Sequence, residues 1–147
     1  MLETDMLRQV LYQQAITAVQ NNGNFPCKIG NEPFKKPSDG SIYGEFWFKT
    51  GKTTQMELGS RRGFECTAGV AQFALFSPEK DGEGAVQRLA DNLRKVFNRK
   101  QYTVPPDGYL NMDPWSVQTV PGTRNGYIVV IVDGSFDFYH RDPSATP

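Results

Sequence analysis

A short stretch, FWFKTGKTTQ at residues 46–55, contains residue types that could bind a nucleotide phosphate. A phosphate-binding loop has two glycines five positions apart. A lysine and a hydroxyl residue follow the second glycine, so that backbone N–H groups curl around the phosphates at the start of a helix. Gly51, Lys52 and Thr53 match the end of this motif, but Phe46 occupies the position of its first glycine. The stretch therefore lacks the turn that a phosphate site requires.

The same stretch has the alternation of β-structure. Polar and apolar side chains alternate before Gly51 and again after it, which is the period of a strand and not of a helix. We therefore predict a hairpin of strands 43–49 and 52–58 with its tight turn at Gly51. Lys49 and Lys52 would then flank an exposed, basic tip.

The other side chains that are capable of chemistry do not combine into a catalytic site. The chain has a single histidine, His140, which we interpret as a surface residue at a strand end; no Ser-His-Asp or Cys-His set can be built around it. Cys27 and Cys66 lack Cys-x-x-Cys spacing, so neither a zinc site nor a disulfide is expected. We predict no catalytic residue, no metal site and no cofactor.

The acidic residues favour structural roles. Glu79, Asp81 and Glu83 precede a helix, whose N-terminus stabilises negative charge. Asp133 and Asp137 lie on one face of a strand, where they could hold a cation, although such a pair more often marks a solvated face.

Two features could contact a partner. Arg61 and Arg62 lie between two glycines in a turn between strands, where they are either solvated or in contact with a partner subunit or a nucleic-acid backbone. Trp47 projects from the outer face of its strand, and the aromatic residues around it could stack on the bases of a single strand. Phe46 and Phe48 fit the core better, because they share a face with other apolar residues.

Length and composition exclude several classes of protein. The 147 residues fit one domain with a hydrophobic core, and 16 basic residues balance 16 acidic ones. A net charge of zero disfavours a domain that holds duplex DNA by neutralising many phosphates. No apolar run approaches the ~20 residues of a membrane span, and the N-terminus carries acids where a signal peptide carries bases. We expect a protein that stays in the cytoplasm where it is made.

Two stretches have the periodicity of amphipathic helices. Apolar residues recur at steps of three and four from Glu3 to Asn21 and again from Ala85 to Phe97. After the first helix, residues 25–40 contain prolines and glycines without periodicity, which predicts an extended arm or loop. Its length suggests that contact with another chain orders it, with Phe34 as the anchoring side chain.

The rest of the chain reads as strands. Residues 64–76 are apolar or small on both faces, which predicts a central strand. Residues 115–120 and 127–140 form a closing hairpin, in which Gly134 is a candidate bulge. Residues 141–147 have nothing to bury and are expected to be a disordered tail.

These elements predict a single α+β domain over residues 1–140, with an antiparallel sheet of about five strands and two helices packed on one face. The second face of that sheet would carry Tyr127, Val129 and Ile131 together with Trp47. Contiguous apolar surface on a soluble protein usually marks an interface, so we expect self-association.

Three stretches, in this order, carry a resemblance to a known family. They are IGNEPFKKPSDG at 29–40, QMELGSRRG at 55–63 and TAGVAQFALFSPEKDGEGAVQRLADNLRKVF at 67–97. Together with the N-terminal helix and the aromatic-rich last strand, they resemble the small tail terminator, or tail completion, proteins of long-tailed bacteriophages. The resemblance covers nearly the whole chain.

The resemblance implies a structural virion protein and not an enzyme. It implies an α+β subunit of a hexameric ring at the head-proximal end of the tail tube, assembled in the host cytoplasm. Such a homo-oligomeric ring stops polymerisation of the tail tube protein and presents a surface to the head–tail connector or a head-completion protein. DNA passes through it without specific binding, and no membrane is involved.

We expect six residues to lie at an interface, namely Phe34, Trp47, Lys49, Lys52, Arg61 and Arg62. Residues 49–54 are expected to contact a neighbouring subunit or the tail tube. Two alternatives stay open at this point: another neck or head-completion protein, and a small nucleic-acid-binding domain that uses Trp47 with Arg61 and Arg62.

Overall fold

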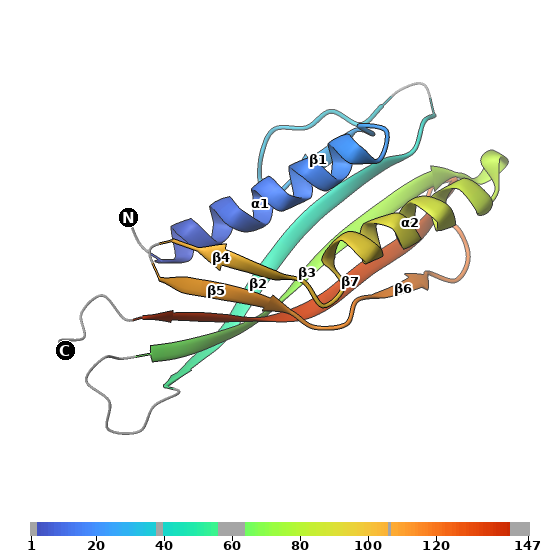
Figure 1. The fold of residues 1–147 in the computed structure, drawn as a ribbon. Coiled ribbons are helices and arrows are strands. Elements are labelled where there is room, and N and C mark those ends of the chain that lie inside the picture. The colour runs from blue at the N-terminus through green and yellow to red at the C-terminus, as the bar shows by residue number, and fades with distance from the viewer. Residues whose placement is uncertain (1–2, 38–39, 56–63, 106, 142–147) are drawn as a thin grey trace.

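The structure, a computed structural model, describes residues 3–37, 40–55, 64–105 and 107–141. These residues form one mixed sheet and two α-helices (Figure 1). In chain order the elements are α1 (Glu3–Asn21), β1 (Cys27–Ile29), β2 (Tyr43–Gln55), β3 (Phe64–Pro78), a short 3-10 turn (Glu79–Asp81), α2 (Gly84–Phe97), β4 (Gln101–Val104), β5 (Gly108–Met112), β6 (Ser116–Thr119) and β7 (Tyr127–Arg141).

The strands are ordered β1-β2-β3-β7-β5-β4, and β6 pairs with the part of β7 that β5 leaves free. β3 and β7 are the two long central strands and pair antiparallel from Phe64–Arg141 to Pro78–Tyr127. The pairing of β1 with β2 is parallel, and the other pairings are antiparallel. The predicted central position of residues 64–76 is therefore confirmed.

Both helices lie on one face of the curled sheet, as predicted (Figure 1). The apolar stripes of the helices bury against that face: Leu7, Leu11, Ala15, Ala18 and Val19 from α1, and Val86, Ala90, Leu93 and Phe97 from α2. The inward side chains of β7 complete the same core, namely Ile128, Val130, Val132, Phe136 and Phe138. The helical period of 3.6 and the strand period of two thus converge on one core.

The predicted hairpin at residues 43–58 is wrong. Residues 43–55 form the single strand β2, which pairs with β3 on both sides of Gly51. The register shifts between Thr50 and Thr53, so that Gly51 and Lys52 together oppose one residue of β3. This is a β-bulge, in which one extra residue interrupts an otherwise regular pairing. A bulge and a tight turn both leave polar–apolar alternation on each side of a glycine. The sequence pattern alone therefore could not distinguish the bulge in β2 from a hairpin turn.

The prediction of about five antiparallel strands is also wrong, because the sheet has seven strands and one parallel pair. Two predicted strands fuse into β2, and β1, β4 and β5 were missed. β1 has only three residues, and β4 and β5 form a hairpin around the Pro-Pro-Asp-Gly sequence at 105–108, of which residue 106 lies outside the described residues.

Gly134 is not a bulge, since β7 pairs with β3 without interruption through Ala71 and Gly134. Its role is to leave space. A Cβ atom at position 134 would overlap the indole ring of Trp115, which lies against the strand at this point. The Trp115 ring stacks in turn on Phe97 at a centroid distance of 4.8 Å, so a glycine in β7 lets the tryptophan join α2 to the sheet.

Candidate interaction surface

The sheet face opposite the helices is the surface on which the sequence placed an interface. Strand alternation sends four rows of side chains outward across β2, β3 and β7. From one end to the other these rows are Tyr43, Phe76 and Val129; Glu45, Ala74 and Ile131; Trp47, Gln72 and Asp133; and Lys49, Val70 and Ser135. The first two rows are mainly apolar, and the last two mix exposed apolar and charged groups.

The arm that follows β1 covers the apolar end of this face. The Phe34 ring stacks on Tyr43 at a centroid distance of 6.2 Å, and Tyr43 stacks on Phe76 at 4.7 Å. The Lys36 ammonium lies 4.2 Å from the centroid of the Tyr127 ring, within the range of a cation–π interaction. Phe34 therefore anchors the arm, as predicted, but on the sheet of its own chain.

The other end of the face stays open. Trp47 is 39% exposed and Val70 is 43% exposed, two of the three large hydrophobic side chains with such exposure among the described residues. Beside them a shallow hollow of about 340 Å³ is lined by Lys49, Thr50, Gly51, Ala68, Gly69, Val70 and Ser135. The small side chains of this set leave room for the hollow, and Val70 is one of the residues that line it.

The charges at the open end are separated by sign. Lys49 is exposed on β2 and forms no ion pair with any residue that the structure describes. On β7, Asp133 accepts a hydrogen bond from the Ser116 hydroxyl at 3.3 Å, and Asp137 lies 3.8 Å from the Cys66 thiol. The open end therefore has a basic side at β2 and an acidic side at β7.

The predicted interface residues have different outcomes. Trp47 and Lys49 share the open end with Val70, as described above. Lys52 is exposed but lies in the bulge of β2 and not at a hairpin tip. Arg61 and Arg62 lie outside the described residues, so their predicted turn and contacts stay predictions.

His140 is not the free surface residue that we predicted. Its ring is half-buried and stacks on Phe138 at a centroid distance of 4.5 Å. Its Nε2 atom forms a 2.9 Å hydrogen bond with the Thr67 hydroxyl, which also bonds the Thr53 hydroxyl at 2.7 Å. This chain ties β7 to β3 and β2 just past the bulge, which is a structural role.

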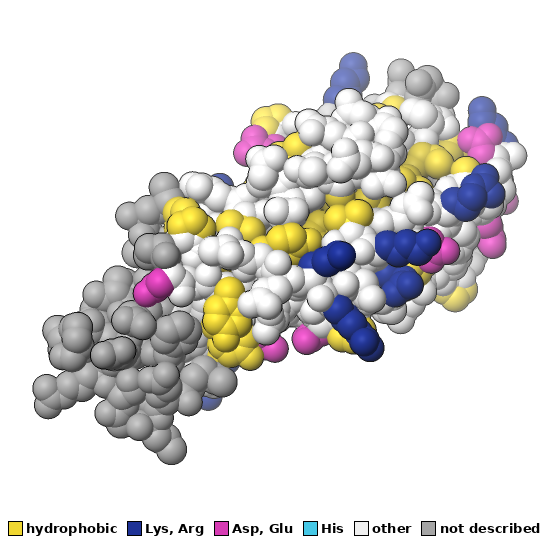
Figure 2. Space-filling view, in the orientation of Figure 1, with side chains coloured by type: hydrophobic (Ala, Val, Ile, Leu, Met, Phe, Trp, Pro, Cys, Tyr) yellow, Lys and Arg dark blue, Asp and Glu magenta, His cyan; other side chains and the backbone are white. Residues whose placement is uncertain are grey.

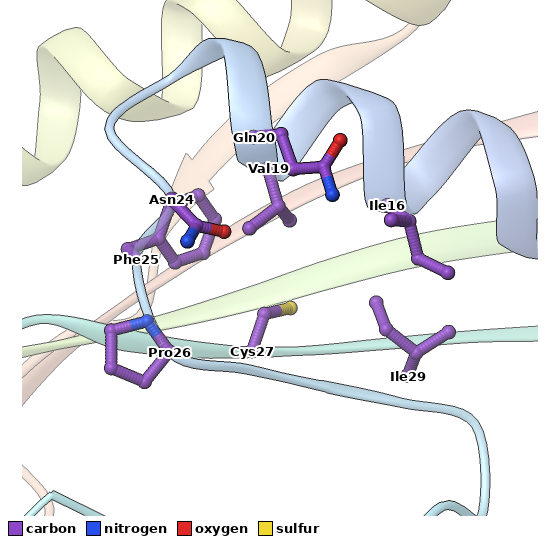
Figure 3. A pocket seen from close by; sticks show the side chains of 8 residues that line it. All are labelled: Ile16, Val19, Gln20, Asn24, Phe25, Pro26, Cys27 and Ile29. Carbon is purple, nitrogen blue, oxygen red and sulfur yellow. The ribbon is translucent and has the colours of Figure 1, made fainter.

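A second hollow lies between the last turns of α1 and strand β1 (Figure 3). It has a volume of about 320 Å³ and is lined mainly by apolar side chains, among them Ile16, Phe25 and Ile29. The Cys27 thiol borders it (Figure 3). Burial, and to a smaller degree the charge of Glu45, raises the pKa of Cys27 to about 12, so this thiol is a poor nucleophile at neutral pH.

The helix side of the molecule carries a cluster of cations. Arg94, Lys95, Arg99 and Lys100 lie at the end of α2 and just after it, and dark blue side chains gather in this region in Figure 2. Their charge favours the negative end of the helix dipole. Asp91, one turn earlier, is the nearest acidic side chain on the helix.

Within the described residues, no three His, Cys, Asp or Glu side chains are grouped so that they could hold a metal ion. Asp133 and Asp137 do project from the same face of β7, but separate hydrogen-bond partners hold them. No helix in the described part of the chain is long and apolar enough to cross a membrane.

Comparison with known proteins gives a fold but no function. No protein-family model matches the sequence, and no curated protein is significantly similar to it. Seventeen chains of solved structures match. One of them has a TM-score of 0.71 and 18% sequence identity, and the alignment covers 92% of this chain and 94% of that one. At this identity the likeness shows a shared fold and no more.

The sequence missed the features that decide which part of the sheet face is open. Nothing in residues 25–40 indicated that Phe34 and Lys36 return to Tyr43 and Tyr127, because such contacts depend on strand order. Val70 was assigned to a doubly covered strand, yet its side chain points to the open end. The alternation of Tyr102, Val104, Leu110 and Met112 around the Pro-Asp-Gly turn could have identified β4 and β5.

Proposed function

We propose that this protein is a structural subunit of a bacteriophage tail, which assembles into a ring that ends the tail tube and joins it to the head connector. The proposal is supported by the resemblance of residues 29–97 to tail terminator proteins. A hexamer is the ring size that the resemblance implies.

The observation that carries this proposal beyond resemblance is a pair of unlike free edges on opposite sides of one sheet. On the side of β2 that faces away from β3, β1 pairs only with Gly44–Phe46, and no described strand pairs with this outer edge beyond that point. At the other side, the outer edge of β4 also lacks a strand partner among the described residues. Two different edges permit a head-to-tail contact, and such a contact generates a ring when the rotation between neighbouring subunits closes.

The edges also carry features that limit their pairing. The free stretch of β2 contains Lys49 and the bulge formed by Gly51 and Lys52. Charged residues and bulges protect edge strands from uncontrolled pairing with strands of other molecules. This favours contact with one complementary surface over open-ended aggregation. It fits a subunit that is soluble alone and assembles at a template.

The test is capping of tail tubes. Purified protein should bind one end of preassembled tubes of the cognate tail tube protein and stop their growth, as seen by negative-stain electron microscopy. A Thr50→Pro variant removes a backbone N–H from the open stretch of β2 and should lose capping. A Thr103→Pro variant makes the same test at β4. Tubes that grow equally with and without the protein would contradict the proposal.

A second candidate function has an observation of its own. The cluster of Arg94, Lys95, Arg99 and Lys100 could contact phosphates, and Trp47 could stack on a base. These features lie on opposite faces of the sheet, so one short strand cannot contact both without crossing an edge. This separation ranks the nucleic-acid-binding domain below the ring.

A further inference from the structure

We propose that the open end of the sheet face pairs with the same surface of a second copy of this chain, about a two-fold axis parallel to β3. The surface consists of Trp47, Lys49, Val70, Asp133, Ser135 and Asp137. The proposal does not depend on the ring, since a two-fold contact closes after two copies and leaves both sheet edges free.

The register of the strands makes this surface self-complementary. Lys49, Val70 and Ser135 form one row across β2, β3 and β7, with Val70 in the middle. Asp133 and Asp137 lie two residues on either side of Ser135 on β7, about 6.8 Å away along the strand. The central strand thus has a cation on one side and two carboxylates on the other.

A two-fold axis along β3 places β2 of one copy over β7 of the other at the same level. Lys49 then lies over Ser135 of the second copy, where its long side chain reaches Asp133 or Asp137. The symmetry repeats the contact, so that two lysines meet two pairs of carboxylates. Val70 meets Val70 at the centre, and packed sheets of this kind lie about 10 Å apart.

The charges favour this axis over one perpendicular to the strands. An axis perpendicular to the strands through Val70 would place Lys49 over Lys49 and Asp133 over Asp137. Like charges in contact disfavour association by several kcal/mol. Of these two axes, only the one along β3 brings opposite charges together.

The shape of the surface also favours a second copy. Gly51, Ala68 and Ser135 leave the hollow beside Val70, which admits an apolar side chain of the size of valine. Phe34 and Lys36 cover the other end of the face, so the contact is confined to the open end. We therefore expect a dimer that forms and dissociates with concentration and not an obligate one.

Sedimentation equilibrium over a range of protein concentrations tests the proposal. Wild-type protein should show a monomer–dimer equilibrium. Lys49→Glu and Asp133→Lys/Asp137→Lys should each weaken the dimer by about tenfold or more, and an equimolar mixture of these two variants should recover it. Ser135→Lys provides an independent variant of the acidic side, should the double variant not fold. Lys95→Glu makes the same charge change on α2 and should leave the dimer unchanged.

Several results would overturn the proposal. Wild-type protein that remains monomeric at about 200 µM would do so, because the proposed dimer should be populated at that concentration. Charge variants that dimerise like wild type, or a mixture that recovers nothing, would also do so. A dimer that appears only after removal of residues 142–147 would show that the tail of the same chain occupies the face. Tube capping is measured separately, so failure of the dimer and failure of the ring can be told apart.

Discussion

At the scale of single residues, the contact between Gly134 and Trp115 is the clearest case of a side chain that the fold requires to be absent. We predict that Gly134→Ala lowers the free energy of unfolding by about 1–3 kcal/mol, because the new methyl group would displace an indole that packs on α2. Chemical denaturation followed by tryptophan fluorescence measures it.

Gly84→Ala is the matched control for that change. The nearest atom to its new methyl group is the flexible guanidinium of Arg88 at 3.4 Å, and alanine favours a helix. Stability should be unchanged or slightly higher. Equal effects at the two glycines would mean that Trp115 does not pack as described.

The pKa of Cys27 predicts a loss of stability at high pH. The folded state keeps the Cys27 proton up to about pH 12, whereas the unfolded state releases it near pH 9. The contribution of the Cys27 thiol to the free energy of unfolding is complete below pH 9. It falls as the pH rises toward 12, by at most ~1.4 kcal/mol per pH unit. Between pH 8 and 10.5, the free energy of unfolding of Cys27→Ala should therefore decrease by about 1–2 kcal/mol less than that of the wild type.

The control for this experiment is Cys66→Ala, which retains Cys27. Burial also raises the pKa of Cys66, followed in effect by the charge of Asp137, but that side chain lies on the outer face. The variant should keep most of the wild-type decline. Urea denaturation at each pH, under reducing conditions, gives the slopes. Parallel slopes for wild type and Cys27→Ala would show that Cys27 does not titrate differently on folding.

At the scale of elements, the bulge in β2 is the feature with the sharpest consequence. Deletion of Lys52 removes the extra residue and leaves Gly51 opposite Ala68, so the inward positions of Phe46 and Thr53 are kept. We predict that this deletion is tolerated, with a change in melting temperature of only a few degrees. Circular dichroism during heating measures it.

Deletion of Glu45 is the contrasting change in the same strand. It shifts one side of the strand by one residue and turns Phe46, a fully buried ring, toward the outer face. This variant should be unfolded or strongly destabilised. If the two deletions cost the same, the register described for β2 would be wrong.

The elements differ in how far the sequence could predict them. Helices α1 and α2 and strands β3 and β7 follow from periodicity, because each buries one continuous stripe or face. β6 is mostly exposed and was predicted only as the first strand of the closing hairpin. β1 could not be found in this way, since its three residues are held by parallel pairing to β2 and not by a pattern of their own. The arm illustrates the same limit, because Phe34 is held by Tyr43, which lies nine residues later in the chain at the start of β2.

The candidate site was predictable in its residues more than in its geometry. Trp47 was identified from alternation and Lys49 from the predicted hairpin tip, and both are exposed. Their relation to Val70, Asp133 and Asp137 depends on the order β2-β3-β7, which alternation does not determine. The sequence indicated the long strands, but it did not indicate which strands are neighbours in the sheet.

At the scale of the whole molecule, the balance of charge predicts weak binding to duplex DNA. The net charge is zero, and the cations at the end of α2 and just after it number only four. We expect a dissociation constant no tighter than about 10⁻⁴–10⁻⁶ M near physiological salt, with little sequence preference. Fluorescence anisotropy with a labelled duplex measures it.

Nanomolar binding would instead support the nucleic-acid-binding domain. Two double variants then locate the contact: Arg61→Ala/Arg62→Ala for the predicted turn, and Lys95→Ala/Arg99→Ala for the end of α2. Loss of tight binding in either would place that function ahead of the ring.

The central claim is assembly into a ring at the end of a tail tube, and mass photometry of the protein with tail tube fragments tests it most directly. The account predicts that a ring of about 99 kDa, six times the 16.5 kDa subunit, assembles at one end of each tube without nucleic acid. A protein that stays monomeric or dimeric at every concentration, and never joins a tube end, would contradict it.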